Sequence, residues 1–433
     1  MSPFLPYIQQ ITFNLKKHFG LFSFGLFFIF SCTNKTSSIS KTKADHETLL
    51  VATEGTILNY NIEKNKIAWQ YKSVRDTIQN RNYFVLDKQQ IYMPFESGNL
   101  INFDVNTGKI IWNDQTYGSD GEIQFGGEET LLPSLMPLYI TKPFVDEENV
   151  VIPTMGHPEK LNAFLYCFNK KTGKKNWYHQ LPTNFNHFAP VKCRNYYFVN
   201  SAVYLSMHST DVGVDTSYGM YDHNDDKNRF ERPIYNQMQS DDKNLYIGDE
   251  KGKFYCLELD ENASVPNSDI KNPNNTFIKN PKVFKWTFSD PAFSFQKSHI
   301  TFLEDHILYT EMSSDSEETS CFFALNTTDG KVKWKKIIKN TVLNWTLCND
   351  RIVGYTEKTI FYMDKSGENY IEIPVEDKPI SNIEIMSPNQ FIYATKKGIE
   401  VFDLKTKKEK IIFSKSLIKD PYSNVQIKYI PKN

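Results

Sequence analysis

The chain has 433 residues with 50 basic and 51 acidic side chains, so its formal net charge is −1, and 40% of the residues are hydrophobic. This balance excludes an intrinsically disordered protein, which combines low hydrophobicity with high net charge, and it gives no overall electrostatic case for nucleic-acid binding. The length is ample for a large buried core.

The first 31 residues have the pattern of a secretory signal. Lys16 and Lys17 form a basic region, and Phe19–Phe30 is an apolar run that is short for a transmembrane helix. The following pair, Ser31 and Cys32, resembles the lipobox of bacterial lipoproteins, in which the cysteine is acylated and the signal is removed, although a smaller residue is usual at position 30. We predict a lipoprotein signal peptide over residues 1–31 and lipidation at Cys32. An ordinary cleavable signal or a signal anchor is the alternative.

Residues 32–46 are rich in Ser, Thr and Lys, so we predict a flexible tether between the lipid and the folded domain. The folded domain is predicted to span residues 47–433. It begins with three strand patterns, Thr48–Ala52, Ile57–Ile62 and Lys66–Tyr71. No long stretch after residue 47 has the periodicity of an amphipathic helix, which indicates an all-β domain.

The segment Leu100–Trp112 is a motif that recurs along the chain. It is predicted to form a strand, a tight turn and a second strand that carries Trp112. Gly108 suits a turn position with positive φ, and the side-chain oxygens of Asp104 and Thr107 can bond the N–H groups of the turn. One hairpin cannot bury an indole ring by itself, so Trp112 is predicted to dock on a neighbouring copy.

Further copies follow the same frame with increasing divergence. Three are clear, and they contain Asn65 with Trp69, Gly173 with Trp177, and Gly330 with Trp334; asparagine is the other residue that tolerates a left-handed backbone. A fourth is split into strands at Phe254–Glu258 and Val283–Trp286, with the loop Asp260–Lys282 between them. Weaker copies are Met220–Phe230, Phe361–Ile371 and Val401–Ile411.

Together the copies form a ladder with rungs 37 to 65 residues apart: Trp69, Trp112, Trp177, Phe230, Trp286, Trp334, Ile371 and Ile411. All-β repeats of this size are typical of propellers. We predict an eight-bladed β-propeller of four-stranded antiparallel blades, with seven blades as the fallback if Met220–Phe230 is not a copy. The C-terminal run Asn424–Ile430 is predicted to pair with the first blade and close the ring. The repeated tryptophans, glycines and Asp104 are interpreted as structural residues.

Chemical motifs are few. The cysteines other than Cys32 are interpreted as buried apolar residues, because their number is odd and no CxxC pair occurs; a Cys321–Cys348 bridge is left open. Asp222–Asp226 resembles a calcium loop but lacks its turn glycine, so it is assigned to a hairpin turn and no metal site is predicted. His187 and His208 lie in predicted loops and are the first candidates for a binding site, with a hydrogen-bonded loop histidine as the alternative.

The spacing Asp104–Thr107–Gly108–Trp112 resembles the tryptophan-docking motif of PQQ-like β-propellers, and the resemblance covers roughly residues 47–430. Quinoprotein dehydrogenases of this group have adjacent cysteines and sometimes a CxxCH haem site. This chain has neither motif, so no cofactor and no enzyme activity are expected. A lipid anchor with eight blades is similar to the propeller lipoprotein family of the outer-membrane β-barrel assembly machine, which is a non-catalytic scaffold.

We therefore predict a monomeric, lipid-anchored propeller of the bacterial outer membrane that binds a protein partner of the cell envelope and does not bind nucleic acid. Function resides in sites placed on folds, so the fold leaves other functions open. The alternative is a glycan- or small-molecule-binding propeller, which the aromatic loops Tyr117–Phe125 and Tyr218–Tyr221 favour. A third is an enzyme that uses the mouth of the channel.

Overall fold

The computed structural model describes residues 44–77, 79, 81–115, 138–155, 163–184, 186–211, 215–219, 234–241, 243–259, 284–314, 318–348, 350–419 and 423–432. Several sequence predictions lie outside these residues: the signal and Cys32, most of the tether, the loop Asp260–Lys282, the proposed calcium loop, Phe230 and Tyr117–Phe125. Within the described residues no helix has the length and apolarity needed to cross a membrane.

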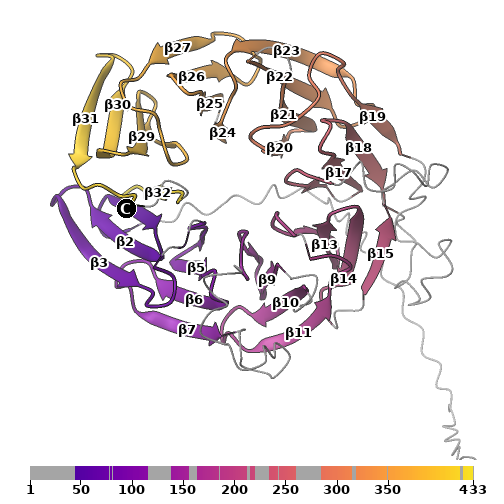
Figure 1. The fold of residues 1–433 in the computed structure, drawn as a ribbon, viewed down its shortest axis with the longest axis horizontal. Helices are drawn as coiled ribbons and strands as arrows, with labels where there is room; N and C mark the ends of the chain where they lie inside the picture. The colour runs from indigo at the N-terminus through magenta and orange to yellow at the C-terminus, as the bar shows by residue number, and fades with distance from the viewer. Residues whose placement is uncertain are drawn as a thin grey trace, which may run out of the picture. The chain divides into compact units, whose positions relative to one another are not determined.

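The strands form eight four-stranded antiparallel sheets, which follow one another around a ring in Figure 1. The strands of each blade are given from the inside outwards. Blade 1 consists of β32 (Gln426–Ile430), β1 (Thr48–Thr53), β2 (Thr56–Asn61) and β3 (Lys66–Lys72), and blade 2 of β4 (Val85–Asp87), β5 (Gln90–Pro94), β6 (Asn99–Asp104) and β7 (Ile110–Gln115). Blade 3 consists of β8 (Phe144–Val145), β9 (Asn149–Pro153), β10 (Phe164–Asn169) and β11 (Lys175–Gln180), and blade 4 of β12 (Val191–Cys193), β13 (Tyr196–Ser201), β14 (Tyr204–Ser209) and β15 (Asp215–Gly219).

Blades 5 to 8 continue the same order. Blade 5 consists of β16 (Gln239–Ser240), β17 (Asn244–Gly248), β18 (Phe254–Glu258) and β19 (Trp286–Phe288), and blade 6 of β20 (Thr301–Glu304), β21 (Ile307–Ser313), β22 (Thr319–Asn326) and β23 (Val332–Lys339). Blade 7 consists of β24 (Asn344–Cys348), β25 (Arg351–Tyr355), β26 (Thr359–Asp364) and β27 (Ile371–Pro374), and blade 8 of β28 (Glu384–Ser387), β29 (Gln390–Thr395), β30 (Gly398–Asp403) and β31 (Lys408–Phe413). The prediction of eight four-stranded blades is confirmed.

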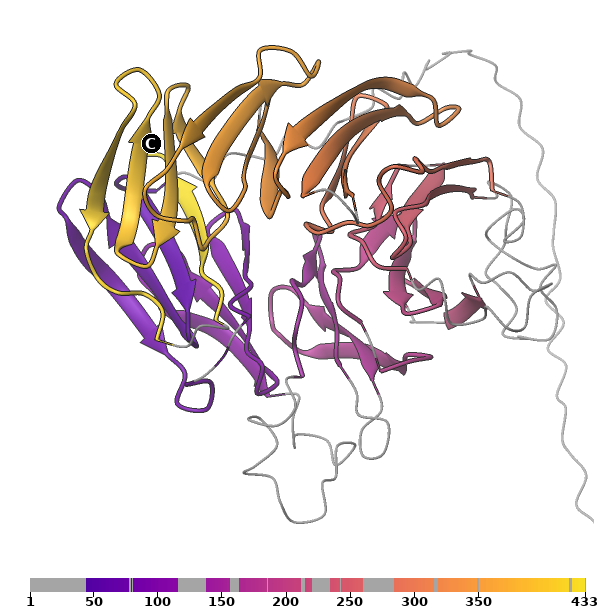
Figure 2. The ribbon, with the colours of Figure 1, turned by 45° about the horizontal axis from the view of Figure 1, so that its top comes forward.

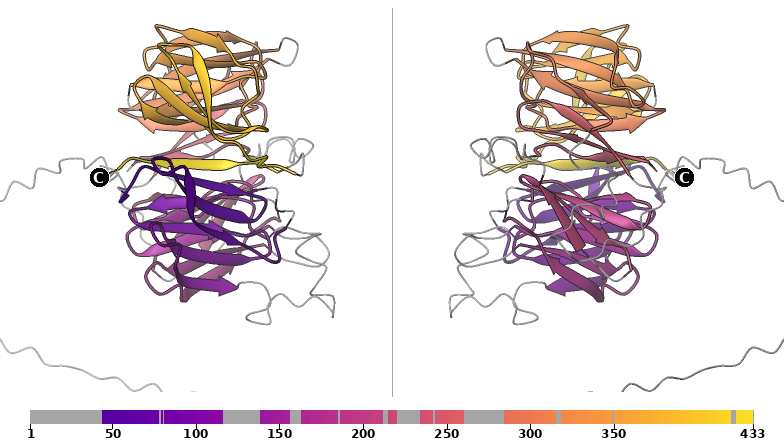
Figure 3. Two further views of the ribbon diagram at one scale, coloured as in Figure 1. Left: turned by 90° about the vertical axis from the view of Figure 1, so that its left-hand side faces the viewer. Right: turned by 90° about the vertical axis from the view of Figure 1, so that its right-hand side faces the viewer.

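The last strand of the chain closes the ring. β32 pairs antiparallel with β1, with Leu50 opposite Lys428 and Thr48 opposite Ile430. Figure 3 shows this yellow strand lying beside the indigo strands of blade 1. Blade 1 therefore takes its inner strand from the C-terminus and its other three strands from the N-terminus. The predicted closure is confirmed, and it leaves the inner edge of β1 fully paired.

The hydrophobic core is divided among the contacts between neighbouring blades. Each of the eight blade-to-blade contacts has its own cluster of buried apolar side chains. The second and third strands of most blades are almost entirely buried, whereas the outer strands alternate between exposed and half-buried residues, as in β3. This pattern follows because middle strands are covered by blades on both faces and outer strands lie at the rim.

Antiparallel pairing fixes which connections share a face of the propeller. The turn between the second and third strands of each blade lies on the same face as the connection to the next blade, because each strand reverses the direction of the one before. We call this the loop face. The turns between the third and fourth strands, which carry the recurring glycines, lie on the opposite face. Figure 2 shows the blades tilted, with the hairpins at their ends visible.

The fourth blade differs from the prediction. Its outer hairpin is formed by β14 and β15, which come earlier in the chain than the predicted copy Met220–Phe230. Small and polar residues make up most of the run from Tyr204 to Gly219, so the sequence predicts a loop there. That interpretation is wrong, because pairing with the buried strand β13 makes β14 a strand.

Candidate functional site

The recurring tryptophans lie against the recurring turns of the next blade. The indole N–H of Trp69 donates to the Val105 carbonyl at 2.9 Å, and that of Trp112 donates to the Lys170 carbonyl at 2.8 Å. Gly108 has a φ of +69°, and a Cβ added there would lie 2.5 Å from the Trp69 ring. Each such contact, in which an indole of one blade covers a turn glycine of the next, is called a docking seam below.

The other predicted repeat residues occupy equivalent places. Gly173 lies under Trp112, and Gly330 lies under Trp286, whose N–H donates to the Thr327 carbonyl at 2.8 Å. Trp334 covers Gly367, and Trp177 approaches the Thr210 carbonyl at 3.5 Å. Asp104 accepts hydrogen bonds from the backbone N–H and hydroxyl of Thr107, both at 2.8 Å. These contacts hold hairpins and blades together.

Four of the cysteines are buried free thiols: Cys167, Cys193, Cys256 and Cys321. The Cys321–Cys348 bridge that the sequence left open is therefore not formed. Burial raises the pKa of Cys167, Cys256 and Cys321 to about 12, which keeps these thiols protonated and unreactive at neutral pH. Among the described residues, no three His, Cys, Asp or Glu side chains gather in a way that could hold a metal ion.

A cavity of about 530 Å³ opens on the loop face around blade 4. Its walls come from the connection between blades 3 and 4, the β13–β14 turn, the connection between blades 4 and 5, and the β17–β18 turn; they include His187, Phe188, Asn200, Val203, Tyr204, Ile234, Tyr235 and Glu250. The lining is mainly apolar and aromatic with a few polar groups, which is typical of ligand sites of this size. We call it the loop-face cavity.

Aromatic rings organise one wall of the loop-face cavity. The Tyr235 ring meets the His299 ring edge-on with their centroids 4.6 Å apart, and Phe188 meets Tyr235 in the same way at 5.6 Å. His299 Nδ1 lies 3.1 Å from the Tyr235 carbonyl. Burial lowers the pKa of His187 and of His299, so both imidazoles are neutral at pH 7. His187, which the sequence analysis named as a candidate binding residue, thus lines a cavity.

Asn200 places an unsatisfied polar atom at the same cavity. Its side chain is buried, and its Nδ2 donates to the Asn236 carbonyl at 3.2 Å. Its Oδ1 has no hydrogen-bond partner among the described residues. Buried polar atoms are normally satisfied, so this oxygen is available to accept a hydrogen bond from an occupant of the cavity. No motif in the sequence points to Asn200, which lies near the end of the buried strand β13.

The second histidine candidate, His208, has a structural position instead. It is fully buried in β14, and its ring stacks on Trp177 with the centroids 6.2 Å apart. Neither ring nitrogen has a hydrogen-bond partner among the described residues. Burial, helped by His179, lowers the pKa of His208 to about 3. The ring therefore packs the contact between blades 3 and 4 as a neutral group and is closed to a ligand.

Replacing His208 by phenylalanine is expected to stabilise the protein by about 1–2 kcal/mol at pH 7, because the ring stack remains and two unsatisfied nitrogens disappear. The folded state also excludes a proton that the unfolded chain binds near pH 6.5. The free energy of unfolding of the natural chain therefore falls as the pH drops from 6.5 towards 3, and the variant should lose this part of the fall. Chemical denaturation at pH 7 and pH 5 tests both points, and equal losses in the two proteins would contradict them.

Charged groups meet near the innermost strands. Lys428 in β32 forms a salt bridge with Glu384 in β28 at 3.0 Å, and Lys142, from the connection between blades 2 and 3, is close enough to influence both. Burial raises the pKa of Glu384. Solvent reaches part of Lys142, but the protein atoms around it lower its pKa. The Glu384–Lys428 ion pair therefore joins the inner strands of blades 8 and 1.

The comparisons with known proteins agree with this geometry. The family model described as outer membrane protein assembly factor BamB matches residues 33–268. No curated protein matches the chain. Among solved structures, BamB from Moraxella catarrhalis matches with a TM-score of 0.51 and 13% identity, over 84% of this chain and 92% of that chain. Quinohemoprotein alcohol dehydrogenase from Comamonas testosteroni matches with a TM-score of 0.57 and 11% identity, over 91% and 76%. At these identities the structural likenesses show the fold alone.

Proposed function

The chain belongs to the family of the outer membrane protein assembly factor BamB, and from this premise we propose that it is a lipid-anchored, non-catalytic propeller that binds envelope proteins during outer-membrane protein assembly. The observation that carries the proposal is the family match itself, which spans more than half of the chain. The match begins at residue 33, directly after Cys32, where a mature lipoprotein would start. This coincidence supports Cys32 as the lipidated residue, residues 1–31 as the signal and residues 32–46 as the tether.

Two features of the described residues support a binding role rather than catalysis. The charged groups near the axis form a salt bridge between Glu384 and Lys428, and the buried thiols are held protonated. The loop-face cavity, in contrast, offers apolar and aromatic surface with one neutral histidine, His187. Such a surface suits the side chains of a protein partner, because apolar contacts with a few polar groups give interface cores their affinity.

A small molecule or glycan is the second candidate for the loop-face cavity. The unsatisfied Oδ1 of Asn200 and the rings of Phe188 and Tyr235 favour it, because sugars combine ring faces with hydroxyl donors. A competition experiment with a soluble glycan distinguishes the two candidates. The soluble glycan would displace a glycan ligand from the cavity but would leave a complex with a protein partner intact.

The anchor and the partner are tested together in the native membrane. We expect the intact mass of the membrane-extracted protein to equal that of a diacylated or triacylated chain beginning at Cys32, and affinity capture in mild detergent to recover an outer-membrane assembly component. Cys32→Ala should abolish acylation and release the protein from the membrane, because two or more acyl chains supply the stable anchoring. The control Cys321→Ala should keep the lipid. An unmodified chain that retains residues 1–31 would contradict the anchor.

A further inference from the structure

The two contacts of blade 8 differ from the docking seams. An indole covers the turn glycine at four other contacts, through the pairs Trp69–Gly108, Trp112–Gly173, Trp286–Gly330 and Trp334–Gly367. The outer strands of blades 4, 7 and 8 carry no tryptophan, and the turn that would face the outer strand of blade 4 lies outside the described residues. A hollow lies at each contact of blade 8 instead, with a volume of about 480 Å³ towards blade 7 and about 410 Å³ towards blade 1.

The register of β31 explains why its residues do not fill the hollow towards blade 1. In blade 2 the β-bulge precedes the tryptophan, so Trp112 pairs with Asn102. In blade 8 the bulge comes later in the outer strand. Lys410 therefore pairs with Val401, which is the counterpart of Asn102 in blade 2, and the next residue, Ile411, pairs with Glu400. Successive side chains of a strand point to opposite faces. The side chain of Ile411, the predicted eighth rung, therefore belongs to the face towards blade 7; the residue borders both hollows and is 43% exposed.

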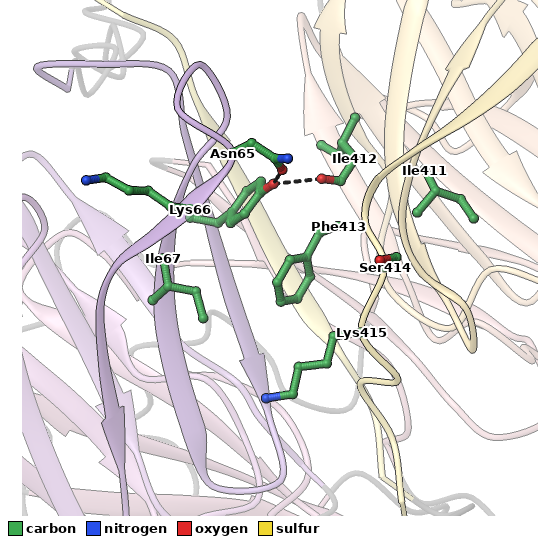
Figure 4. A pocket seen from close by; sticks show the side chains of 9 residues that line it. Asn65, Lys66, Ile67, Ile411, Ile412, Phe413, Ser414 and Lys415 are labelled. Carbon is green, nitrogen blue, oxygen red and sulfur yellow. Dashed lines mark hydrogen bonds between the residues drawn. The ribbon is translucent and has the colours of Figure 1, made fainter.

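The hollow towards blade 1 keeps the walls of a docking seam without its indole (Figure 4). Asn65 has the position of the turn glycine, with a φ of +51°. Tyr60 in β2 is the counterpart of Phe103 in β6. In the neighbouring docking seam the Trp69 ring stacks on the Phe103 ring with their centroids 6.2 Å apart. The Tyr60 hydroxyl donates to the Ile412 carbonyl at 2.7 Å, and its ring lies 5.0 Å from that of Phe413. We call this hollow the empty slot.

The second hollow of blade 8 supports this interpretation independently. Lys407 has the glycine position there, with a φ of +55°, and Phe402 has the position of Phe103; both line the hollow. On the blade 7 side, Ile371 pairs with Tyr362 and so has the register of a docking tryptophan. Ile371 is much smaller than an indole and is 43% exposed. A hollow thus appears at both contacts of blade 8, where the indole is missing.

The surroundings of the empty slot are cationic. Lys66 and Lys415 line it, and Lys408 and Lys410 follow along β31; all four are exposed and form no ion pair among the described residues. The outer edge of β31 is also unpaired in the described part of the chain, since β31 pairs only with β30. An extended acidic segment is complementary to this edge in charge and in hydrogen bonding.

The tether of this chain cannot supply the missing ring. Residues 32–46 contain no Phe, Tyr or Trp and have no acidic run. We propose that the empty slot receives a tryptophan side chain from an extended, acidic segment of a partner protein, which lies along β31. This inference rests on the proposed function as a protein-binding propeller and names the surface and the chemistry of the partner.

The probe for the empty slot is a dye-labelled peptide, Asp-Asp-Trp-Asp-Asp, titrated with the full-length protein in mild detergent and followed by fluorescence anisotropy. We expect the peptide with alanine in place of tryptophan to bind at least about tenfold more weakly, because a buried indole is a typical hot spot. Higher salt should weaken the binding, because the lysines are exposed. Equal affinity for the two peptides would overturn the proposal.

Matched variants separate the slot from general charge effects. Asn65→Gly with Lys410→Trp places an indole and a glycine in the register of a docking seam, so it should fill the slot, keep or raise the melting temperature and abolish specific binding. Lys410→Ala removes the same charge without filling the slot and should weaken binding only a few-fold. Lys66→Ala should also weaken binding, whereas Lys109→Ala, at the equivalent place beside the filled Trp69 seam, should not.

The outcomes separate the slot from the proposed function. Unchanged peptide affinity in the filled variant would overturn the slot, even if an outer-membrane assembly component still co-purifies with the protein. A concentration-dependent dimer that disappears on filling would assign the slot to a second copy of this chain and also overturn the proposal. Specific peptide binding without such a co-purifying component would support the slot and count against the assembly role.

Discussion

Replacing Gly173 by valine is expected to reduce the free energy of unfolding by about 2–5 kcal/mol. A Cβ at this position would lie 2.6 Å from the Trp112 ring, and the backbone has a φ of +70°. The left-handed backbone costs about 1–2 kcal/mol for a residue with a side chain, and overpacking adds about 1–3 kcal/mol. The indole must move, so its hydrogen bond to the Lys170 carbonyl is also lost. Denaturant unfolding monitored by tryptophan fluorescence measures the change.

The matched control for this prediction is Asn65→Val. Asn65 has the same place in its hairpin and a φ of +51°, but no indole covers it, because the empty slot lies there. This variant bears the backbone cost and loses the hydrogen bond between the Asn65 side chain and the Tyr60 hydroxyl, but it meets no indole, so its loss of stability should be smaller than that of Gly173→Val. If the two losses were equal, the contact with Trp112 would not be the reason for glycine at position 173.

Removing residues 424–433 is expected to destroy the closed propeller, so that the protein is recovered unfolded or aggregated at temperatures where the full chain is folded. The truncation deletes β32 and with it the buried side chains of Val425, Ile427 and Ile430. Burial of three such side chains contributes about 5–9 kcal/mol, which is as large as the net stability of a typical domain. The inner edge of β1 would also lose its partner and become a template for aggregation. Circular dichroism and thermal melting measure the loss.

A shorter truncation serves as its control. Removing only Lys432 and Asn433 keeps β32 and deletes the exposed salt bridge between Lys432 and Glu63, which contributes little. The melting temperature should then stay close to that of the full chain. A synthetic peptide of residues 424–433 should restore the fold of the long truncation, because it supplies the missing strand. A long truncation that melts like the full chain would show that β32 does not hold the ring closed.

Local sequence signals were sufficient for individual strands and hairpins. The predicted strand Lys66–Tyr71 is β3 to within one residue, and the predicted strand Phe254–Glu258 is β18 with the same bounds. These signals are local because β-branched and aromatic residues favour a half-buried pleated strand, and because glycine alone accepts the left-handed turn without cost. They were insufficient for blade 4, where small and polar residues dominate β14 and β15, and where the hairpin is completed by the pairing of β14 with β13.

Contacts between blades explain the remaining differences between prediction and structure. His208 was expected in a loop and is instead buried against Trp177, because the neighbouring blade covers it. Ile411 was expected as the eighth rung, but the position of one bulge turns it away from blade 1. A bulge of one residue exchanges the faces of a strand, and the sequence of β31 contains no residue that marks where the bulge falls.

The sequence by itself determined the repeat, the number of blades, the closing strand and the structural residues of the docking motif, because each depends on residue types at fixed spacing within one hairpin. Only the tertiary structure decided which residues meet at the loop-face cavity, where connections from blades 3, 4 and 5 converge, and which blade contact is left unfilled. Both depend on packing between segments far apart in the chain, such as Tyr60 with Phe413. Spacing along the chain cannot specify such contacts, because they arise when the ring closes.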